Sequence, residues 1–357
     1  MTAANTTITE GRFGALSLAR FAAGAAKLIA SVLLTFLGLL TVTFLIGRVI
    51  PIDPVLAVTG DHASPAVYAR VRLELGLDKP LYEQFWIYIS KAATGDFGMS
   101  VLTGNTVFAD ILRVFPATIE LATVGIVFGT LFGVPLGVLS AVKQGRLIDQ
   151  LVRVLGLIGY SAPIFWLGLM GLLIFYARLD WAAGPGRLDI AYEYIVPAVT
   201  GMLLVDSAIA GEWAVFANAF SHIALPALLL GYFSMAYVSR MTRSFMLNEL
   251  AQEYVVTARV KGIPERRIIW GHALRNAAVP LVTVIALSYA NLLEGSVLTE
   301  TVFAWPGIGQ YITHSLQTAD MNAVLGGTIV VGTVFIGINL LSDLLYGLLD
   351  PRVRRAQ

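Results

Sequence analysis

The sequence predicts an all-α polytopic membrane protein with six transmembrane helices. Of its 357 residues, 57% are hydrophobic and 13% are charged, whereas a soluble globular chain is about 45–50% apolar and about 25% charged. The apolar residues form long blocks without charge, and a helix needs about 20 such residues to cross a bilayer. With flanking residues added to the two shortest blocks, six reach this length. The predicted spans are 28–47, 121–142, 154–177, 223–239, 277–293 and 322–342.

The distribution of Lys and Arg predicts how these helices are oriented. Sixteen of the 24 basic residues lie in alternate segments, namely before residue 28, at 143–153, at 240–275 and after residue 351. The other eight lie in the segments between these. Because cytoplasmic segments of membrane proteins are enriched in Lys and Arg, we expect both termini and the 240–275 segment to be cytoplasmic.

The alternation of polar and apolar segments divides the chain into four parts. Residues 1–27 are predicted to be a cytoplasmic tail, and 28–115 to contain the first span and an extracytoplasmic cap. Residues 116–351 contain the other five spans, and 352–357 are the cytoplasmic C-terminus. The block at 28–47 is too long for the apolar region of a cleavable signal peptide, so we expect it to be a retained anchor.

Within the cap, two helices are expected. Ser64 and Pro65 are a typical N-cap and first helical residue, and an aromatic-rich helical segment follows at 78–95. Beyond the third span, the apolar segment 194–205 is only about half a bilayer span long, so we expect it to be re-entrant or interfacial. Pro163 lies inside the third predicted span, where neighbouring helices must satisfy its backbone.

The chain lacks the residues that several common chemistries require. It contains no cysteine, which excludes disulfides and thiolate metal sites. None of its five lysines follows a glycine, so it has no Walker A phosphate-binding loop. Its four histidines are far apart in sequence and form no zinc-binding pattern. We therefore expect no cofactor, no metal and no nucleic acid on this chain, and a membrane-embedded enzyme is disfavoured.

The segment 258–280 contains five basic residues and one acid between two apolar stretches. We expect the preceding helix to continue out of the membrane, Gly262 and Pro264 to form a turn, and a second helix to follow. The apolar residues of this second helix would be exposed outside the bilayer, so we expect them to pack on a cytoplasmic partner. They are Ile268, Ile269, Ala273 and Leu274.

The same segment resembles a known loop. Ala258, Gly262 four residues later and the His272-Ala273-Leu274 triplet follow the spacing of the EAA loop, which marks the membrane subunits of bacterial ABC importers. The two residues before Ala258 and the residue after Leu274 depart from the broad family. The stretch YVVTARVKGIPERRIIWGHALRNAAVP closely resembles one subgroup, the first permease subunit of dipeptide, oligopeptide and nickel importers. The stretches GDFGMSVLTGNTV, FPATIELA and TETVFAWPGIGQYI resemble the same subgroup.

This resemblance implies the type I ABC importer permease fold and transport of peptides or similar small solutes, with nickel and opine-like solutes left open. It also implies that the loop forms a short coupling helix that docks on a separate ATPase subunit. The residues assigned to this ATPase-docking loop are Glu253, Ala258, Gly262, Pro264, His272, Ala273, Leu274, Arg275 and Asn276.

The resemblance further implies a set of partners in a bacterial inner membrane. These are a second permease that completes a heterodimer, two ATP-binding cassette ATPases that bind ATP and Mg²⁺, an extracytoplasmic substrate-binding protein, and membrane lipid. The chain itself would then perform no covalent chemistry. The alternative is an ion-coupled secondary transporter. Such folds usually show internal repeats and several intramembrane charges, whereas this sequence shows no repeat and essentially one deep acid.

Two acids in the predicted spans need separate interpretations. Glu120, at the outer start of the second span, is expected to cap or pair locally at the interface. Glu294 lies well inside the fifth helix once the flanking residues of the 277–293 block are included. Asn291, three residues earlier, shares its helix face. A carboxylate that faces lipid is costly. We therefore expect this face either to line the translocation path or to hydrogen-bond a neighbouring helix.

Overall fold

The computed structural model describes residue 26 and residues 29–47, 54–59, 64–74 and 76–349. Almost all of the predicted N-terminal tail and all of the predicted C-terminal segment at 352–357 therefore lie outside the described residues. Within the described residues the chain is helical, and the β pairing consists of one isolated bridge between Met99 and Thr106. The predicted all-α fold class is confirmed.

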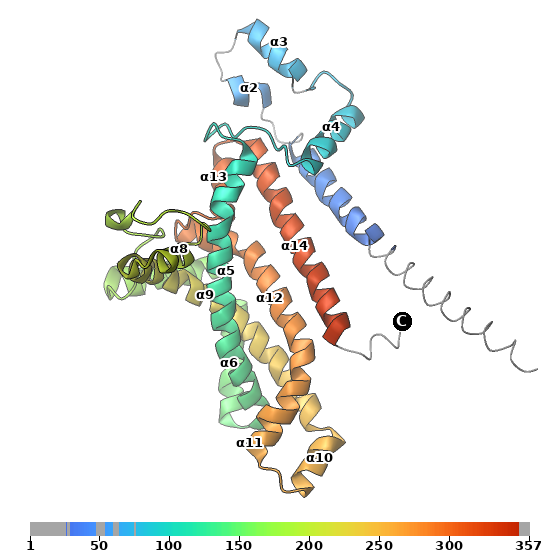
Figure 1. Ribbon diagram of the computed structural model, residues 1–357, viewed down its shortest axis with the longest axis vertical. Coiled ribbons are helices and arrows are strands. Elements are labelled where there is room, and N and C mark those ends of the chain that lie inside the picture. Colours follow the sequence, from blue (N-terminus) through green and yellow to red (C-terminus); the bar gives the residue numbers. More distant parts are fainter. Residues whose placement is uncertain (1–25, 27–28, 48–53, 60–63, 75, 350–357) are drawn as a thin grey trace, which may run out of the picture.

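Five helices in the described part of the chain are long and apolar enough to cross a membrane. They are Ile29–Gly47, α5 (Val107–Val142), α9 (Trp213–Leu250), the run Glu265–Val302, and Met321–Ser342 within α14 (Met321–Leu349). The run Glu265–Val302 consists of α11 (Glu265–Arg267), the π-helical η3 (Ile268–Ala273) and α12 (Leu274–Val302). In Figure 1, α5, α12 and α14 extend along the long axis of the molecule.

The third predicted span, 154–177, is broken rather than continuous. Helix α6 (Leu147–Ser161) meets α7 (Ile164–Gly171) and its π-helical extension η1 (Leu172–Arg178) at an angle of 101°. Pro163 lies at the break. Proline cannot donate a backbone hydrogen bond and disfavours helical backbone in the residue before it, and Ala162 is extended, with a ψ of 134°. The total is six spans if this bent pair counts as one.

The helices begin earlier than the charge-free blocks predicted. Helix α5 starts at Val107, where the Thr106 hydroxyl accepts a hydrogen bond from the Ala109 backbone N–H. Residues 107–115, assigned to the cap from sequence, are therefore the first turns of this helix. Helix α9 likewise starts at Trp213, two residues after Gly211. The charge-free blocks follow the hydrocarbon region, whereas a helix begins at its cap, so the two boundaries differ.

Helices α5 and α9 pack closely because small residues lie between them. A Cβ atom at Gly129 would lie 2.6 Å from Ser234 Cβ, and one at Gly137 would lie 2.5 Å from the Ser239 carbonyl oxygen. Glycine at such positions lets helices in lipid approach each other. A 2.9 Å hydrogen bond between the hydroxyls of Ser234 and Ser288 joins α9 to α12. The core among these helices includes Leu121, Ile223, Leu230 and Leu292.

Short helices lie at the two ends of the bundle (Figure 1). One end has α2 (Pro54–Thr59), α3 (Pro65–Glu74), α4 (Leu81–Ala93) and α13 (Ile308–Gln317), and the opposite end has α10 (Glu253–Val260) and α11. The Ser64 hydroxyl accepts from the Val67 N–H, as expected of an N-cap. The segment 194–205 contains turns and the first residues of α8 (Leu203–Ala210), and no span.

Candidate functional site

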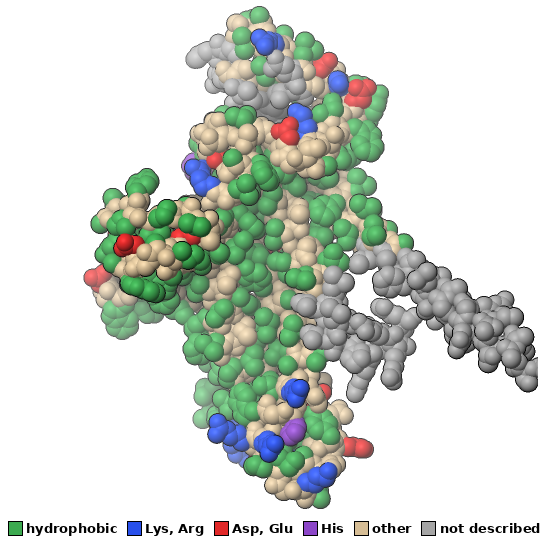
Figure 2. All heavy atoms as spheres, in the orientation of Figure 1, with side chains coloured by type: hydrophobic (Ala, Val, Ile, Leu, Met, Phe, Trp, Pro, Cys, Tyr) green, Lys and Arg blue, Asp and Glu red, His purple; other side chains and the backbone are tan. Residues whose placement is uncertain are grey.

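The segment with the EAA-loop spacing forms two helices joined by a turn at one end of the bundle. Figure 2 shows Lys and Arg side chains gathered at the end that contains α10 and α11. The expectation that α9 continues unbroken through this segment is wrong, because α9 ends at Leu250 and α10 begins at Glu253. Gln252 between them is extended, with a φ of −76° and a ψ of 151°. No glycine or proline marks this break, so nothing in the local sequence indicates it.

The turn after α10 is a Schellman motif centred on Gly262. The Ile263 N–H donates to the Ala258 carbonyl, and the Gly262 N–H donates to the Arg259 carbonyl. Gly262 has a φ of +74°, and a Cβ added to it would meet nothing within 4 Å. Glycine is therefore required here for its left-handed backbone and not for a close approach. Pro264 then precedes the first residue of α11.

Helix α10 has one buried and one exposed apolar face. Val255 and Ala258 are buried against Ile268. On the opposite face, Val256 is 56% exposed and Val260 is 83% exposed. These two residues are four apart and adjacent on the helix surface. Two apolar side chains are therefore exposed side by side on this helix.

The apolar residues predicted to meet a partner are mostly covered by the chain itself. Ile268 and Ala273 are fully buried. Ala273 lies in a core cluster with Val138 and Met246, against which Ile269 and Leu274 also pack. The expectation that all four side chains are exposed is therefore wrong. The run from Glu265 continues directly into α12, so Ile268 and Ala273 face the bundle. The exposed large apolar residues of this segment are Val256 and Val260 on α10 and Trp270 on the run.

The other residues of the predicted docking loop differ in exposure. Glu253, Pro264, His272, Arg275 and Asn276 are exposed, and Leu274 is half-buried. Asn276 Nδ2 lies 3.4 Å from Glu249 Oε2, and the Tyr254 hydroxyl donates to the same oxygen over 2.7 Å. Glu249 therefore joins α10, α9 and α12. It was not predicted, because it lies before the segment with the loop spacing.

At the opposite end, a second unpredicted carboxylate anchors the segment after α12. Glu300 is fully buried. One of its oxygens accepts from the hydroxyls of Thr118 and Ser296, and the other accepts from the N–H groups of Gly309 and Gln310. These contacts fasten the start of α13 to α12 and α5. The sequence places Glu300 in an apparently external segment, but α12 continues to Val302 and buries it.

Two family models match the chain. One, "Binding-protein-dependent transport system inner membrane component", matches residues 133–355, and the other, "Binding-prot-dependent transport system membrane comp, N-term", matches residues 23–122. The chain belongs to this permease family. It is a membrane subunit of an ABC importer and not a secondary transporter, which confirms the resemblance inferred from the loop.

Three relatives of this permease align over most of both chains. The first is the probable D,D-dipeptide transport system permease protein DdpB of Escherichia coli K12, with 44% identity over 320 residues, 89% of this chain and 93% of the relative. The di/tripeptide permease DppB of Pseudomonas aeruginosa is 42% identical over 321 residues, 90% and 95% of the two chains. The dipeptide permease DppB of E. coli K12 is 44% identical over 324 residues, again 90% and 95%.

In this permease, Asn291 and Glu294 are exposed on α12, whereas Leu292 and Leu293 between them are buried in the core. Neither polar side chain hydrogen-bonds another described residue. The described part of the chain therefore does not support the alternative in which this face hydrogen-bonds a neighbouring helix. On the opposite side of α12, the hydroxyls of Tyr289 and of Thr123 on α5 lie 3.0 Å apart.

Glu120 pairs over a long range rather than locally. Its carboxylate forms an ion pair with Arg187 and accepts from the Leu204 N–H at the start of α8. The Arg187 guanidinium also lies 5.3 Å from the centre of the Trp305 ring. The expectation of a local partner is therefore wrong. Residues from three separate segments meet here. Because they are far apart in sequence, the contact could not be predicted from local sequence patterns.

Proposed function

We propose that this permease imports peptides, forming half of a translocation path whose other half is a second, related permease. The proposal rests on the names of the aligned relatives, which transport D,D-dipeptides, di- and tripeptides, and dipeptides. Nickel and opine-like solutes are the competing substrates.

The observation that best supports ATP-driven coupling is that α10 has one face buried against the chain and one apolar face exposed. Its inner face, with Val255 and Ala258, is fixed to the chain, and its outer face presents Val256 and Val260. A helix packed in this way transmits force from a docked ATPase to the bundle instead of bending. Glu249 extends the connection to α9 and α12. In this proposal ATP and Mg²⁺ are bound by two partner ATPases, and the permease performs no covalent chemistry.

The proposed orientation places α10 and both termini in the cytoplasm, and α2, α3, α4 and α13 outside. The concentration of basic residues at 240–275 supports it. An extracytoplasmic substrate-binding protein would then deliver the peptide to the end where Glu300 and the Glu120–Arg187 pair join the outer segments. Asn291 and Glu294 are proposed to line the path. There the Glu294 carboxylate would bind the cationic end of a peptide weakly enough to release it.

The test is reconstitution of the complete importer in proteoliposomes. Vesicles should accumulate a labelled dipeptide only when ATP and the binding protein are both present, and an imposed ion gradient should not replace ATP. ATP-dependent uptake of nickel without uptake of peptide would disprove the peptide assignment. Uptake driven by an ion gradient alone would disprove the mechanism.

A further inference from the structure

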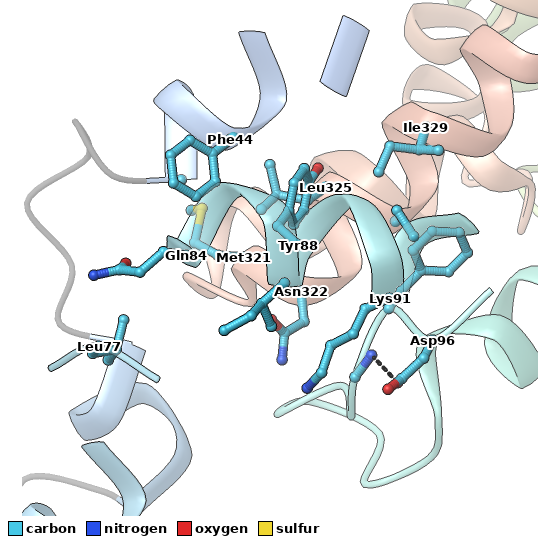
Figure 3. A pocket seen from close by; sticks show the side chains of 16 residues that line it. Phe44, Leu77, Gln84, Tyr88, Lys91, Asp96, Met321, Asn322, Leu325 and Ile329 are labelled. Atoms are coloured by element: carbon cyan, nitrogen blue, oxygen red, sulfur yellow. Dashed lines mark hydrogen bonds between the residues drawn. The ribbon is translucent and has the colours of Figure 1, made fainter. Parts of the chain in front are cut away.

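A cavity of about 190 Å³ lies where the helix Ile29–Gly47, α4 and the first turns of α14 meet (Figure 3). Two of its three walls are membrane-spanning helices, so it lies at the membrane surface next to the cap. The lining from α4 follows one helix face and includes Gln84, Ile87, Tyr88 and Lys91. The lining from α14 includes Met321, Asn322, Leu325 and Ile329.

Direct contacts hold the walls of this cavity together. The hydroxyls of Thr43 and Tyr88 lie 2.8 Å apart and join the first span to α4. The Phe44 ring packs edge-on against Phe85, with ring centres 5.2 Å apart. A Cβ atom at Gly47 would lie 3.0 Å from Leu325 Cδ1, so the first span and α14 are also in close contact. The cavity is therefore a built feature of the packed structure.

The lining is divided into a polar and an apolar side. In Figure 3, Lys91, Asp96 and Asn322 lie on one side, and Phe44 and Ile329 lie on the other. Lys91 and Asp96 are exposed, and neither forms an ion pair with a described residue. A cation, an anion and an apolar wall side by side are complementary to an amphiphile with a charged head and a hydrocarbon tail.

One buried acceptor at this cavity is left unpaired. The Gln84 amide nitrogen donates to the Lys79 carbonyl over 2.7 Å. Its carbonyl oxygen Oε1 is buried without a hydrogen-bond partner. A buried acceptor without a partner is costly, so this end of the cavity favours a donor such as a water molecule.

We propose that this cavity binds a phosphatidylethanolamine molecule from the adjacent leaflet, the outer one in the proposed orientation. Its phosphate lies beside Lys91, because a lysine ammonium and a phosphate form charge-assisted hydrogen bonds. Its ammonium group supplies a donor to Asp96, and part of an acyl chain lies along Phe44 and Ile329. The volume suits part of a lipid, since a cavity of about 150 Å³ accommodates benzene. The bound lipid would fasten α4 to the two spans.

The test is native mass spectrometry of the purified importer, with dioleoyl-phosphatidylethanolamine as the probe. Lys91→Ala should weaken lipid binding by about fivefold, the effect of losing one typical hydrogen bond. Ile87→Trp should fill the cavity and abolish the adduct. Lys79→Ala is the matched control, because Lys79 lies on the same outer segment outside the cavity lining, and it should bind lipid normally. In detergent without added lipid, melting temperatures should match in all three variants.

Three results would overturn the proposal. Wild-type importer could retain no phosphatidylethanolamine, or Lys91→Ala and Lys79→Ala could reduce binding equally. Glycerophosphoethanolamine, which has the headgroup without the chains, could also compete at the same concentration as the lipid. A crosslinker at residue 91 that captures the substrate-binding protein in place of lipid would assign the cavity to that protein and likewise disprove lipid binding.

Discussion

The hydroxyl of Tyr254 donates to Glu249 Oε2 over 2.7 Å and so fastens α10 to the last turn of α9. Asn276 on α12 reaches the same oxygen. Burial and the hydrogen bond to Glu249 raise the pKa of Tyr254 to about 12. The hydroxyl therefore stays protonated, and able to donate, throughout the neutral range. One carboxylate thus connects the projecting helix to two spans, and a movement of α10 reaches both.

Replacing Tyr254 by Phe should uncouple ATP hydrolysis from transport. A hydrogen bond to a charged group contributes about 1.5–3 kcal/mol, so we expect uptake per ATP to fall by about tenfold, which corresponds to about 1.4 kcal/mol. Binding of the ATPases should persist, because Val256 and Val260 are untouched. The measurement is uptake and ATP hydrolysis in the same proteoliposomes. Tyr82→Phe is the control, since Tyr82 is exposed and its hydroxyl lies 3.5 Å from a Glu83 carboxylate oxygen. Unchanged coupling in Tyr254→Phe would refute the role of this joint.

A charge on the exposed face of α10 should release the ATPases. Val260 is 83% exposed, so Val260→Asp costs the isolated permease little, but a carboxylate buried in an interface without a partner costs several kcal/mol. We expect co-purification of the ATPases to be lost while the permease level and melting temperature stay normal. Val67→Asp on α3, also exposed, should leave the complex intact. Retention of the ATPases by Val260→Asp would show that docking occurs elsewhere.

Much of the fold could be predicted from sequence because its causes are local. Charge-free blocks indicate spans wherever lipid excludes unpaired backbone groups, and Gly262 and Pro264 mark a turn by their own backbone preferences. The break at Gln252 contains no such residue. The burial of Glu300 and the pairing of Glu120 with Arg187 depend on contacts between distant segments. The exposure predicted for Ile268 was wrong because it was inferred without the packing of α10 against it.

Substitutions at Gly262 should separate backbone strain from steric fit. A Cβ there would meet nothing within 4 Å, and the φ is +74°. The left-handed backbone conformation is therefore what restricts which residue can occupy position 262. Asparagine tolerates the left-handed region, so Gly262→Asn should transport at near the wild-type rate. A β-branched residue at positive φ costs of order 1–3 kcal/mol, so Gly262→Val should displace α10 and abolish most uptake. ATP-dependent uptake and ATPase co-purification are the measurements. Equal loss in both variants would indicate a steric contact with the ATPase instead.

Removing the charge of Glu300 should destabilise the outer end of the bundle. Its two oxygens accept four hydrogen bonds, and the amide of Glu300→Gln would turn an NH₂ group toward two of the donors. Each unpaired buried group costs about 1–3 kcal/mol, so the melting temperature should fall by several degrees. Glu193→Gln, at an exposed position, is the control. A Glu300→Gln protein with wild-type thermal stability would contradict the anchoring role.

Glu294→Gln tests whether the polar face of α12 lines the path. The glutamine keeps the size and hydrogen-bonding capacity of the side chain but removes its charge. Because Glu294 is exposed and bonds no described residue, its loss should leave the melting temperature near normal. If Glu294 contacts the peptide ammonium, uptake of a dipeptide should slow several-fold in Glu294→Gln. The ratio of N-acetylated dipeptide uptake to dipeptide uptake should therefore rise. Asn291→Asp should have the opposite effect on this ratio, since it adds a carboxylate to the same face. Equal uptake ratios in all three proteins, or failure of Glu294→Gln to assemble with the second permease, would assign Glu294 to the permease interface instead.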